Sequence, residues 1–449
     1  MIPTTPYVPP VDALILPTST PSENLSSLAL AAQILIDGGL VAFPTETVYG
    51  LGASALSESA VKRIFKAKGR PSDNPLIVHV SDRAMLGDLI PGGAEKGICG
   101  EYEALMRSFW PGPLSLIFNL DESTLSPPRN KVAPSVRAGA PSIAIRMPSH
   151  PLALELIRTT GLPLAAPSAN LSSRPSPTRA QHVVEDLGLV RGVGAILDGG
   201  DCQIGVESTV VDFWRRPVEE SSSTGKQEGE VRILRAGGVS AEEIEKCLTE
   251  AGFGFGGKVA DGKVEGKVQV YKRDFSSGDL EERPTTPGMK YKHYSPSNST
   301  VILVRSKDSK DIPTLDDIVR DMLEDSTSPK SVGLMLTEET LARMSLSTYN
   351  LLEFSSLPPT DSPTSVPIPN STSPPLYSYS IGSQSRPLES AQRLFAGLRF
   401  LDEIKLSEGR RGVDVILLEC VEEVGVGLAV MERSRKAAGG QKQELSFRS

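Results

Sequence analysis

The chain has 449 residues, of which 39% are hydrophobic and 23% charged, so it is long enough for two or three domains and apolar enough to bury their cores. A formal charge of -8 argues against a protein that binds nucleic acid chiefly through a broad basic surface. No stretch approaches the roughly 18 consecutive apolar residues of a membrane-spanning helix, and the first basic residue is Lys62, so we expect neither a secretory signal nor a transit peptide and predict a cytoplasmic protein.

The first expected domain spans residues 25–248 and follows a segment, residues 1–24, that we expect to be flexible. Within the domain, short apolar runs alternate with stretches of helical periodicity. β-Branched runs of this length, bounded by Gly and Pro, are typical of buried strands. The runs that predict strands are Leu40–Phe43, Leu76–Val78, Leu114–Ile117, Ile143–Ile145, Ala195–Leu197 and Thr209–Val211. The alternation predicts an α/β domain.

One helix of this domain ends in a group of cations. It is expected to begin near Ser57, to bury one apolar face and to end at Gly69, which suits the left-handed position after a helix. Lys68 and Arg70 therefore lie on either side of its end. Cations there can simply complement the helix dipole, whereas the rigid polar turn Pro71–Pro75 that follows Arg70 suits a phosphate clamp. Both interpretations stay open at this point.

Three polar turns adjoin predicted strands. Pro44–Gly52 follows the first strong strand, Pro167–Asn170 follows the apolar run Leu164–Ala166, and Glu207–Thr209 introduces the last strand. Polar groups at the carboxyl ends of strands are where open α/β sheets bind ligands. Each turn could equally be a plain connection, and tripeptides such as SAN or EST are too short to identify a function alone.

A linker is expected over residues 249–298, because the composition becomes rich in glycine and charge. Residues 252–257 fit the dinucleotide pattern GxGxxG, but they follow a helical stretch instead of a strand and precede no helix. Residues 257–263 fit GxxxxGK, yet Val264 stands where a phosphate-binding loop needs Ser or Thr. We interpret both patterns as linker sequence.

A second α/β domain is expected over residues 299–440. The runs Thr300–Val304, Val332–Leu336 and Val413–Leu418 predict strands with helices between and after them, which favours a small Rossmann-like sheet. Residues 355–385 interrupt this domain with a segment dense in Pro and Ser. We predict that this segment is a disordered insertion.

Six motifs in a fixed order carry a resemblance to a known family. The sequence reads PTETVYGLG, KGRP, IRMP, SAN, ESTVVD and ILRAGG between residues 44 and 238, and this series resembles the Sua5/YrdC family. The later PTTPGMKYKHYSP resembles the linker of the two-domain Sua5 branch, and the resemblance covers about residues 25–248 and 287–437. It implies an α/β protein with a YrdC-like twisted open sheet and helices, followed by a linker and a smaller Rossmann-like α/β Sua5 domain.

The resemblance implies a nucleotidyltransferase. Members condense L-threonine, bicarbonate or CO₂, and ATP into L-threonylcarbamoyladenylate and pyrophosphate. The product is the donor for N6-threonylcarbamoyladenosine (t6A37) in tRNAs that read ANN codons, so a downstream tRNA threonylcarbamoyltransferase complex is an expected partner. The rival interpretation is a double-stranded RNA-binding module, since the basic segment around Lys68 would suit a phosphate backbone. The acidic net charge and the aromatic content of 5% count against it.

The resemblance also implies which residues form the site. Threonine would contact Thr47, His79, Arg146, Ala166 and Ser208. ATP would be bound by Arg70, Asn74, Ser142, Ser168, Ser176 and Arg235, with His293 or Tyr294 reaching it from the linker. The catalytic residues would be Lys68, Arg70, Ser168 and Asn170. Without the resemblance, Arg146 would be interpreted as part of a surface salt bridge and His79 as a satisfied core histidine.

No protein-bound metal is expected, and Mg²⁺ would be carried by the triphosphate of ATP. The histidines are dispersed and the four cysteines include no CxxC pair, so we expect reduced thiols and neither disulfides nor metal ligands. The segment Met289–Tyr294 carries two cations, a histidine and two aromatics, which predicts a lid over the nucleotide site. The alternative is that its aromatics only join the two domains.

Overall fold

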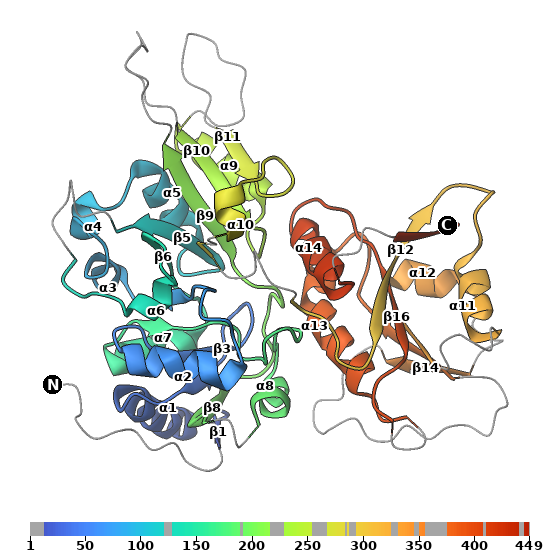
Figure 1. The fold of residues 1–449 in the computed structure, drawn as a ribbon, viewed down its shortest axis with the longest axis horizontal. Helices are drawn as coiled ribbons and strands as arrows, with labels where there is room; N and C mark the ends of the chain where they lie inside the picture. The colour runs from blue at the N-terminus through green and yellow to red at the C-terminus, as the bar shows by residue number, and fades with distance from the viewer. Residues whose placement is uncertain are drawn as a thin grey trace, which may run out of the picture. The chain divides into compact units, whose positions relative to one another are not determined.

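The structure of the protein is a computed structural model. It describes residues 13–120, 128–188, 192–215, 229–253, 267–282, 285–286, 293–324, 331–344, 350–354, 375–406, 410–439 and 444–448. The chain divides into two compact units (Figure 1). The N-terminal unit contains Met1–Ser172 and Ser176–Tyr291, and the C-terminal unit contains Ser173–Pro175 and Lys292–Ser449.

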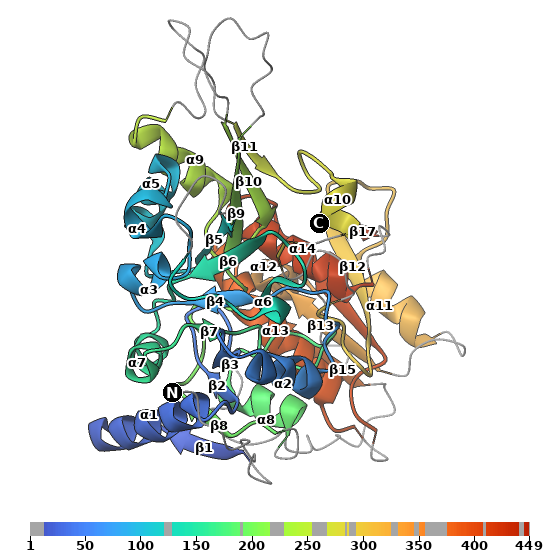
Figure 2. The same ribbon diagram turned by 60° about the vertical axis from the view of Figure 1, so that its left-hand side comes forward.

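The N-terminal unit is built on a mixed sheet of eleven described strands. Their order in space is β1-β8-β2-β3-β7-β4-β6-β5-β9-β10-β11, so β1 and β8 lie at one end of the sheet and β10 and β11 at the other (Figure 2). The strands are β1 (Leu14–Pro17), β2 (Val41–Phe43), β3 (Gly50–Ser54), β4 (Ile77–His79), β5 (Leu114–Asn119), β6 (Ser142–Arg146), β7 (Leu164–Ala165), β8 (Ala195–Asp198), β9 (Thr209–Arg215), β10 (Gly229–Arg235) and β11 (Lys267–Val270). The six strands predicted for this unit are confirmed.

The middle of this sheet collects residues that are distant in sequence. β4 pairs with β6 in parallel, which places His79 beside Arg146. β5 pairs with β6 in the antiparallel sense, which places Ser115 on the other side of Arg146. β9 runs parallel to β5 and begins one residue after Ser208. Three positions of the predicted threonine site therefore lie on or next to neighbouring strands.

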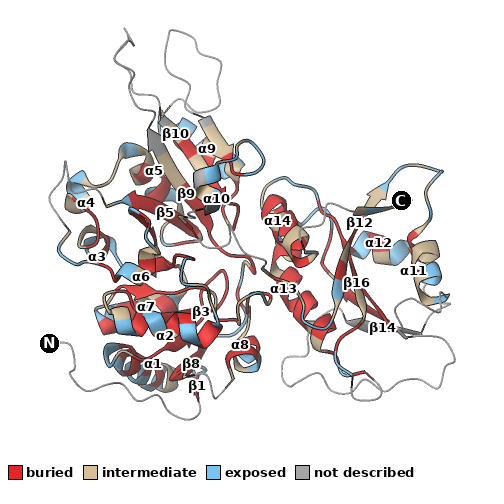
Figure 3. Cartoon of the chain, in the orientation of Figure 1, coloured by how far each residue is buried: buried red, intermediate tan, exposed pale blue. Residues whose placement is uncertain are grey.

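The helices of the N-terminal unit pack in pairs, α1 against α7 and α5 against α9. Buried apolar side chains of α1 and α7 share a core with those of β2 and β8. Figure 3 marks the buried residues of the chain in red. The helices are α1 (Pro21–Ile36), α2 (Glu58–Lys68), α3 (Arg83–Gly87), α4 (Gly93–Lys96), α5 (Gly100–Phe109), α6 (Pro134–Arg137), α7 (Pro151–Thr160), α8 (Ala180–Leu187), α9 (Ala241–Glu250) and α10 (Gly278–Glu282).

Helix α2 forms as its sequence predicts. The hydroxyl of Ser57 accepts a hydrogen bond from the backbone N–H three residues later, which is the usual N-cap interaction. Ile64 and Phe65 are buried on its apolar face. Gly69 follows with a φ of 60°, a left-handed conformation that costs a glycine little. The helix therefore delivers Lys68 to the interior, where only 2% of the residue is exposed.

Two segments that we expected to lack regular structure are ordered in part. Within residues 1–24, β1 pairs with β8, and α1 begins after a capping box in which Thr20 and Glu23 each accept the other's backbone N–H. Within residues 249–298, β11 extends the sheet beside β10, and α10 follows. Both segments therefore contain regular elements that the sequence did not lead us to expect. Most of the two glycine-rich patterns at residues 252–263 lies outside the described residues.

The C-terminal unit has a sheet of six described strands, all of them parallel, in the order β14-β15-β13-β16-β12-β17. The strands are β12 (Thr300–Lys307), β13 (Val332–Leu336), β14 (Asn350–Phe354), β15 (Pro375–Ser380), β16 (Val415–Glu419) and β17 (Glu444–Arg448). The helices are α11 (Leu315–Glu324), α12 (Glu338–Arg343), α13 (Pro387–Glu403) and α14 (Gly427–Ala437). Parallel strands joined through helices confirm the predicted Rossmann-like arrangement.

One correction concerns the expected insertion over residues 355–385. Its last part forms β15, and Leu376, Tyr377 and Tyr379 of this strand are buried. Gly397 of α13 lets that helix approach the strand closely, since a Cβ at this position would lie 2.6 Å from the ring of Tyr379. We did not predict this apolar strand, because the surrounding sequence is rich in Pro and Ser. Residues 355–374 lie outside the described residues.

Candidate active site

The PTETVYGLG motif forms a turn and then strand β3, and its backbone bonds to the loop that carries SAN. Leu51 N–H donates to the carbonyl of Pro167 at 2.8 Å, and Ala169 N–H donates to the carbonyl of Tyr49 at 2.8 Å. Gly50 and Ser168 form an isolated bridge between these two bonds. We did not expect a strand at Gly50–Ser54, because glycine and alanine dominate its sequence. The pairing holds two of the predicted motifs side by side.

The same turn also holds the segment that leads into ESTVVD. Ile204 N–H donates to the carbonyl of Glu46 at 2.8 Å, and Gly205 N–H donates to the carbonyl of Thr47 at 3.1 Å. Backbone hydrogen bonds thus join the PTETVYGLG turn to two segments that lie more than 100 residues further along the chain.

The side chain of Lys68 bonds to the loop that carries the SAN motif. Its Nζ donates to the carbonyl oxygens of Ser168 and Asn170 and lies 3.5 Å from Asn170 Oδ1. The hydroxyl of Ser168 donates to the same Oδ1. Three of the predicted catalytic residues therefore meet, and the ammonium of Lys68 shapes the loop through its backbone.

Arg70, beyond the end of α2, is half-buried and fastened to the turn that follows it. Nε donates to the carbonyl of Asn74 at 3.2 Å, and Nη2 donates to the carbonyl of Pro75 at 2.9 Å. Asn74 is 2% exposed. These bonds keep the arginine beside the turn that precedes β4.

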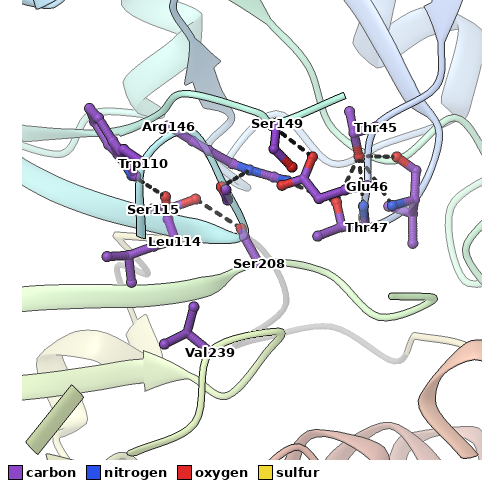
Figure 4. Close-up of polar contacts among 12 residues, drawn as sticks. Thr45, Glu46, Thr47, Trp110, Leu114, Ser115, Arg146, Ser149, Ser208 and Val239 are labelled. Atoms are coloured by element: carbon purple, nitrogen blue, oxygen red, sulfur yellow. Dashed lines mark hydrogen bonds and ion pairs between the residues drawn. The ribbon is translucent and has the colours of Figure 1, made fainter. Parts of the chain in front are cut away.

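Arg146 at the end of β6 is buried in a polar cluster (Figure 4). Nε donates to the carbonyl of Gly112 at 3.1 Å, Nη1 donates to Thr47 Oγ1 at 3.0 Å, and Nη2 forms an ion pair with Glu46. The interpretation of Arg146 as part of a surface salt bridge is wrong, because the side chains of Arg146 and Glu46 are each only 4% exposed. Thr45 supports the cluster through a 2.8 Å contact between its hydroxyl and that of Thr47.

His79 lies beside Arg146 in the sheet and is 4% exposed. Burial, together with the nearby Arg146 cation, lowers the pKa of its imidazole to about 3, so the ring is neutral at physiological pH. Its Nδ1 atom is buried and has no hydrogen-bond partner among the described residues. Nδ1 of His79 is therefore a buried polar atom that could bond a ligand, since a buried polar nitrogen normally has a partner.

Ser208 forms a third polar group with Arg235 and Ser115. Arg235 donates to its carbonyl oxygen from Nε at 3.1 Å and from Nη2 at 2.9 Å, and to its hydroxyl from Nη2 at 3.1 Å. The hydroxyl also lies 2.8 Å from Ser115 Oγ. Gly237 passes so close that a Cβ would lie 2.3 Å from the carbonyl carbon of Ser208. The glycine of ILRAGG is therefore needed for the backbone to approach this serine.

The remaining predicted positions of the N-terminal unit are also buried. Ser176 donates its hydroxyl to Glu207 Oε1 at 2.5 Å. Ser142 is the first residue of β6 and lies opposite Asn119 of β5. Ala166 follows β7, with its N–H bonded to the carbonyl of Ile77 at 3.0 Å, so it lies at the end of a strand next to β4.

Comparisons with known proteins identify the family to which the chain belongs. Residues 33–223 match the family model described as telomere recombination, and residues 239–439 match the threonylcarbamoyl-AMP synthase C-terminal domain. The threonylcarbamoyl-AMP synthase of Bacillus subtilis is 39% identical over 94% of this chain and 95% of its own, and that of Pyrococcus abyssi is 38% identical over 92% and 94%. The chain belongs to the Sua5/YrdC family of threonylcarbamoyl-AMP synthases.

The solved structure of the Sua5/YrdC protein from P. abyssi complexed with L-threonine has the same fold. Its TM-score is 0.62, with 34% sequence identity over 97% of this chain and 99% of that chain. The similarity extends over both units, which agrees with the two-domain branch that the linker motif indicated.

The linker residues of this Sua5/YrdC chain are only partly described, because residues 287–292 lie outside the described ranges. Tyr294 is buried in the C-terminal unit, with its ring 5.0 Å from that of Phe395 and 6.0 Å from the guanidinium of Arg433. The ring of His293 lies 5.6 Å from that of Tyr294. Whether either residue reaches ATP stays a prediction.

Two acidic residues that were not predicted as site residues contact residues that were. Glu46 pairs with Arg146, and Glu207 accepts the hydroxyl of Ser176. Both stand inside motifs that we had selected, PTET and EST. A buried arginine needs an anionic partner. A carboxylate in one motif of the predicted site, together with an arginine in another, is the signal that could have identified Glu46.

Three other features of the described residues concern metal sites, membrane-spanning helices and further cavities. They contain no group of three or more His, Cys, Asp or Glu side chains that could hold a metal ion, and all four cysteines are free. No described helix is long and apolar enough to cross a membrane. A separate cavity of about 370 Å³ lies between the start of α2 and the segment around α6, and none of the predicted site residues lines it.

Proposed function

We propose that the chain condenses L-threonine, bicarbonate or CO₂, and ATP into L-threonylcarbamoyladenylate and pyrophosphate at this cluster. The observation that carries the proposal is that Lys68, Arg146 and Arg235, from three different motifs, are all buried in one unit among hydroxyl and carbonyl groups. Burying a charge costs free energy unless the charge is paired or hydrogen-bonded, and a concentration of buried charged groups is typical of functional sites. A substrate with a carboxylate and a triphosphate supplies such groups.

Threonine would lie at the Arg146 side of the cluster. The guanidinium would donate to its carboxylate, and Thr47 and Ser208 would offer hydroxyl groups. Neutral His79, whose Nδ1 has no partner among the described residues, would bond a polar group of the amino acid. Ala166, which follows β7, would contact the methyl group of threonine. A small site of this kind orients the amine toward the carbon that it attacks.

ATP would lie at the Lys68 side. Lys68 holds the loop of Ser168, Glu207 holds Ser176, and Arg70 is bonded to the carbonyl of Asn74. These four residues, Arg70, Asn74, Ser168 and Ser176, would contact the phosphates together with Ser142 and Arg235. Lys68, Arg70, Ser168 and Asn170 would neutralise or orient the charge that develops as pyrophosphate leaves. The amine nitrogen of threonine forms a bond to the carbon of CO₂ and releases a proton to solvent. An oxygen of the resulting carbamate then attacks the α-phosphorus, the bond between that phosphorus and the oxygen that bridges it to the β-phosphorus breaks, and pyrophosphate leaves.

Mg²⁺ would be held chiefly by the triphosphate, because Mg²⁺ prefers oxygen ligands and the described residues offer no cluster of carboxylates. When bound, it would reduce the negative charge of the departing pyrophosphate. The product is a reactive mixed anhydride, so we propose a tRNA threonylcarbamoyltransferase complex as its consumer. Four free cysteines support a reducing compartment, and we propose the cytoplasm.

The test is pyrophosphate release from purified protein with ATP, L-threonine and bicarbonate, and with each of the three omitted in turn. We expect release only with the complete mixture. Release that is independent of threonine would contradict the proposal. No contact in the described residues favours the double-stranded RNA-binding module instead.

A further inference from the structure

Three groups hold the guanidinium of Arg146. Among the described residues, Nε donates to Gly112, Nη1 to Thr47 and Nη2 to Glu46. A guanidinium has five N–H groups. These bonds use one N–H of each nitrogen, so one N–H on each Nη is left for a ligand.

Glu46 is itself fixed from a second direction. Its Oε2 accepts the backbone N–H of Ser149 at 3.1 Å, just before His150, which caps α7. Both of its oxygens are therefore engaged, one by β6 through Arg146 and one by the entry to α7. A buried carboxylate held at both oxygens keeps the guanidinium bonded to it in one orientation.

We propose that Glu46 is a positioning residue for recognition of the amino-acid carboxylate. It neutralises Arg146 before the substrate binds and directs the remaining N–H groups toward the ligand. Glu46 does not bind that carboxylate itself, because two carboxylates repel each other. The inference rests on the proposed function, in which Arg146 binds the carboxylate of threonine.

Glu46→Gln tests the proposal. The glutamine keeps the size of the side chain and one acceptor oxygen for Arg146, but its amide N–H₂ then faces the N–H of Ser149, donor against donor. We expect the KM for threonine to rise at least tenfold and the KM for ATP to stay within twofold. Glu419→Gln is the matched control, because Glu419 is an equally buried carboxylate, bonded to Thr337 in the C-terminal unit. Its KM for threonine should stay unchanged.

A second readout separates positioning from a loss of stability. L-Threoninamide has a neutral amide in place of the carboxylate, so the ratio of its inhibition constant to the Kd of threonine reports the contact with Arg146. We expect this ratio to fall at least fivefold in Glu46→Gln and to stay unchanged in Glu419→Gln. An unchanged ratio in Glu46→Gln, with an unchanged KM for threonine, would overturn the proposal.

Two further outcomes are informative. If Glu46→Gln does not fold, the same ratio measured in Glu46→Asp decides, because the shorter carboxylate keeps the charge but does not reach both partners; a fall supports the positioning role and a wild-type ratio refutes it. If the wild-type protein does not prefer threonine to threoninamide, the proposed function of Arg146 fails, and the role of Glu46 in recognition fails with it.

Discussion

Replacing Lys68 by methionine should lower both the stability of the N-terminal unit and its activity. Methionine has a similar length but no donor, so the carbonyls of Ser168 and Asn170 lose the group that bonds them. A hydrogen bond to a charged group contributes about 1.5–3 kcal/mol, and a buried acceptor left without a partner costs about 1–3 kcal/mol. Removing the buried charge recovers part of this cost.

The net loss in the free energy of unfolding should be about 3 kcal/mol, which corresponds to a decrease in Tm of about 5 °C for a unit of this size. Release of pyrophosphate should fall about 30- to 1,000-fold, because removal of one group that stabilises developing charge typically costs about 2–4 kcal/mol of the activation barrier. Calorimetry gives the first quantity, and a coupled pyrophosphate assay with saturating substrates gives the second.

Arg70→Ala is the matched comparison, two residues away. Arg70 is half-buried and donates to two carbonyls of the neighbouring turn, so its loss should lower Tm by less than the loss of the fully buried Lys68. Most pyrophosphate release should nevertheless disappear. A Lys68→Met protein with wild-type Tm and activity would refute the reasoning on Lys68, and an Arg70→Ala enzyme of normal activity would refute the phosphate clamp.

Three further predictions follow from the site and the linker. Because a site that bonds the substrate hydroxyl strongly rejects an analogue without it, valine should hardly react, whereas serine should lose only about 1–3 kcal/mol in kcat/KM; similar turnover of valine and threonine would contradict this. The pKa of His79 is lowered to about 3 in the folded chain, whereas the imidazole of the unfolded chain binds a proton below about pH 6.5. Between these two pH values only the unfolded chain is protonated at this position. The free energy of unfolding should therefore fall by about 1.4 kcal/mol for each pH unit as the pH decreases from about 6.5 to about 3. That contribution should be absent from the pH dependence of Tm in His79→Asn, and identical slopes would disprove it. Tyr294→Ala should destabilise the C-terminal unit by about 3–5 kcal/mol, as for other buried aromatics; if activity per folded molecule also falls, the lid is supported, and if it does not, the aromatic only packs within the fold.

Local sequence patterns predicted much of the fold. The β-branched run at Ile143–Ile145 forms part of β6, and Ser57 and Gly69 mark the two ends of α2. Strand β3 was missed because its sequence, GLGAS, has little intrinsic preference for a strand and depends on pairing with β2 and β7. Strand β15 was missed because its apolar residues are embedded in a Pro- and Ser-rich segment.

The candidate site was predictable in its composition but not in its contacts. Lys68 belongs to a recognisable motif, yet its bonds to Ser168 and Asn170 join residues about 100 positions apart, and no local pattern specifies them. The same holds for Glu46 and Arg146. Because a buried ion pair depends on which strands become neighbours, its partners appear only once the sheet order is known.

The most direct test of the central claim is to follow the carbon of bicarbonate into the product. Wild-type protein is incubated with ATP, L-threonine and carbon-13-labelled bicarbonate, and the nucleotides are separated and analysed by mass spectrometry. We predict labelled L-threonylcarbamoyladenylate in amounts equal to the pyrophosphate released, and its loss in Arg146→Ala. Hydrolysis of ATP without any labelled adenylate, or labelled adenylate formed equally well by Arg146→Ala, would contradict the account.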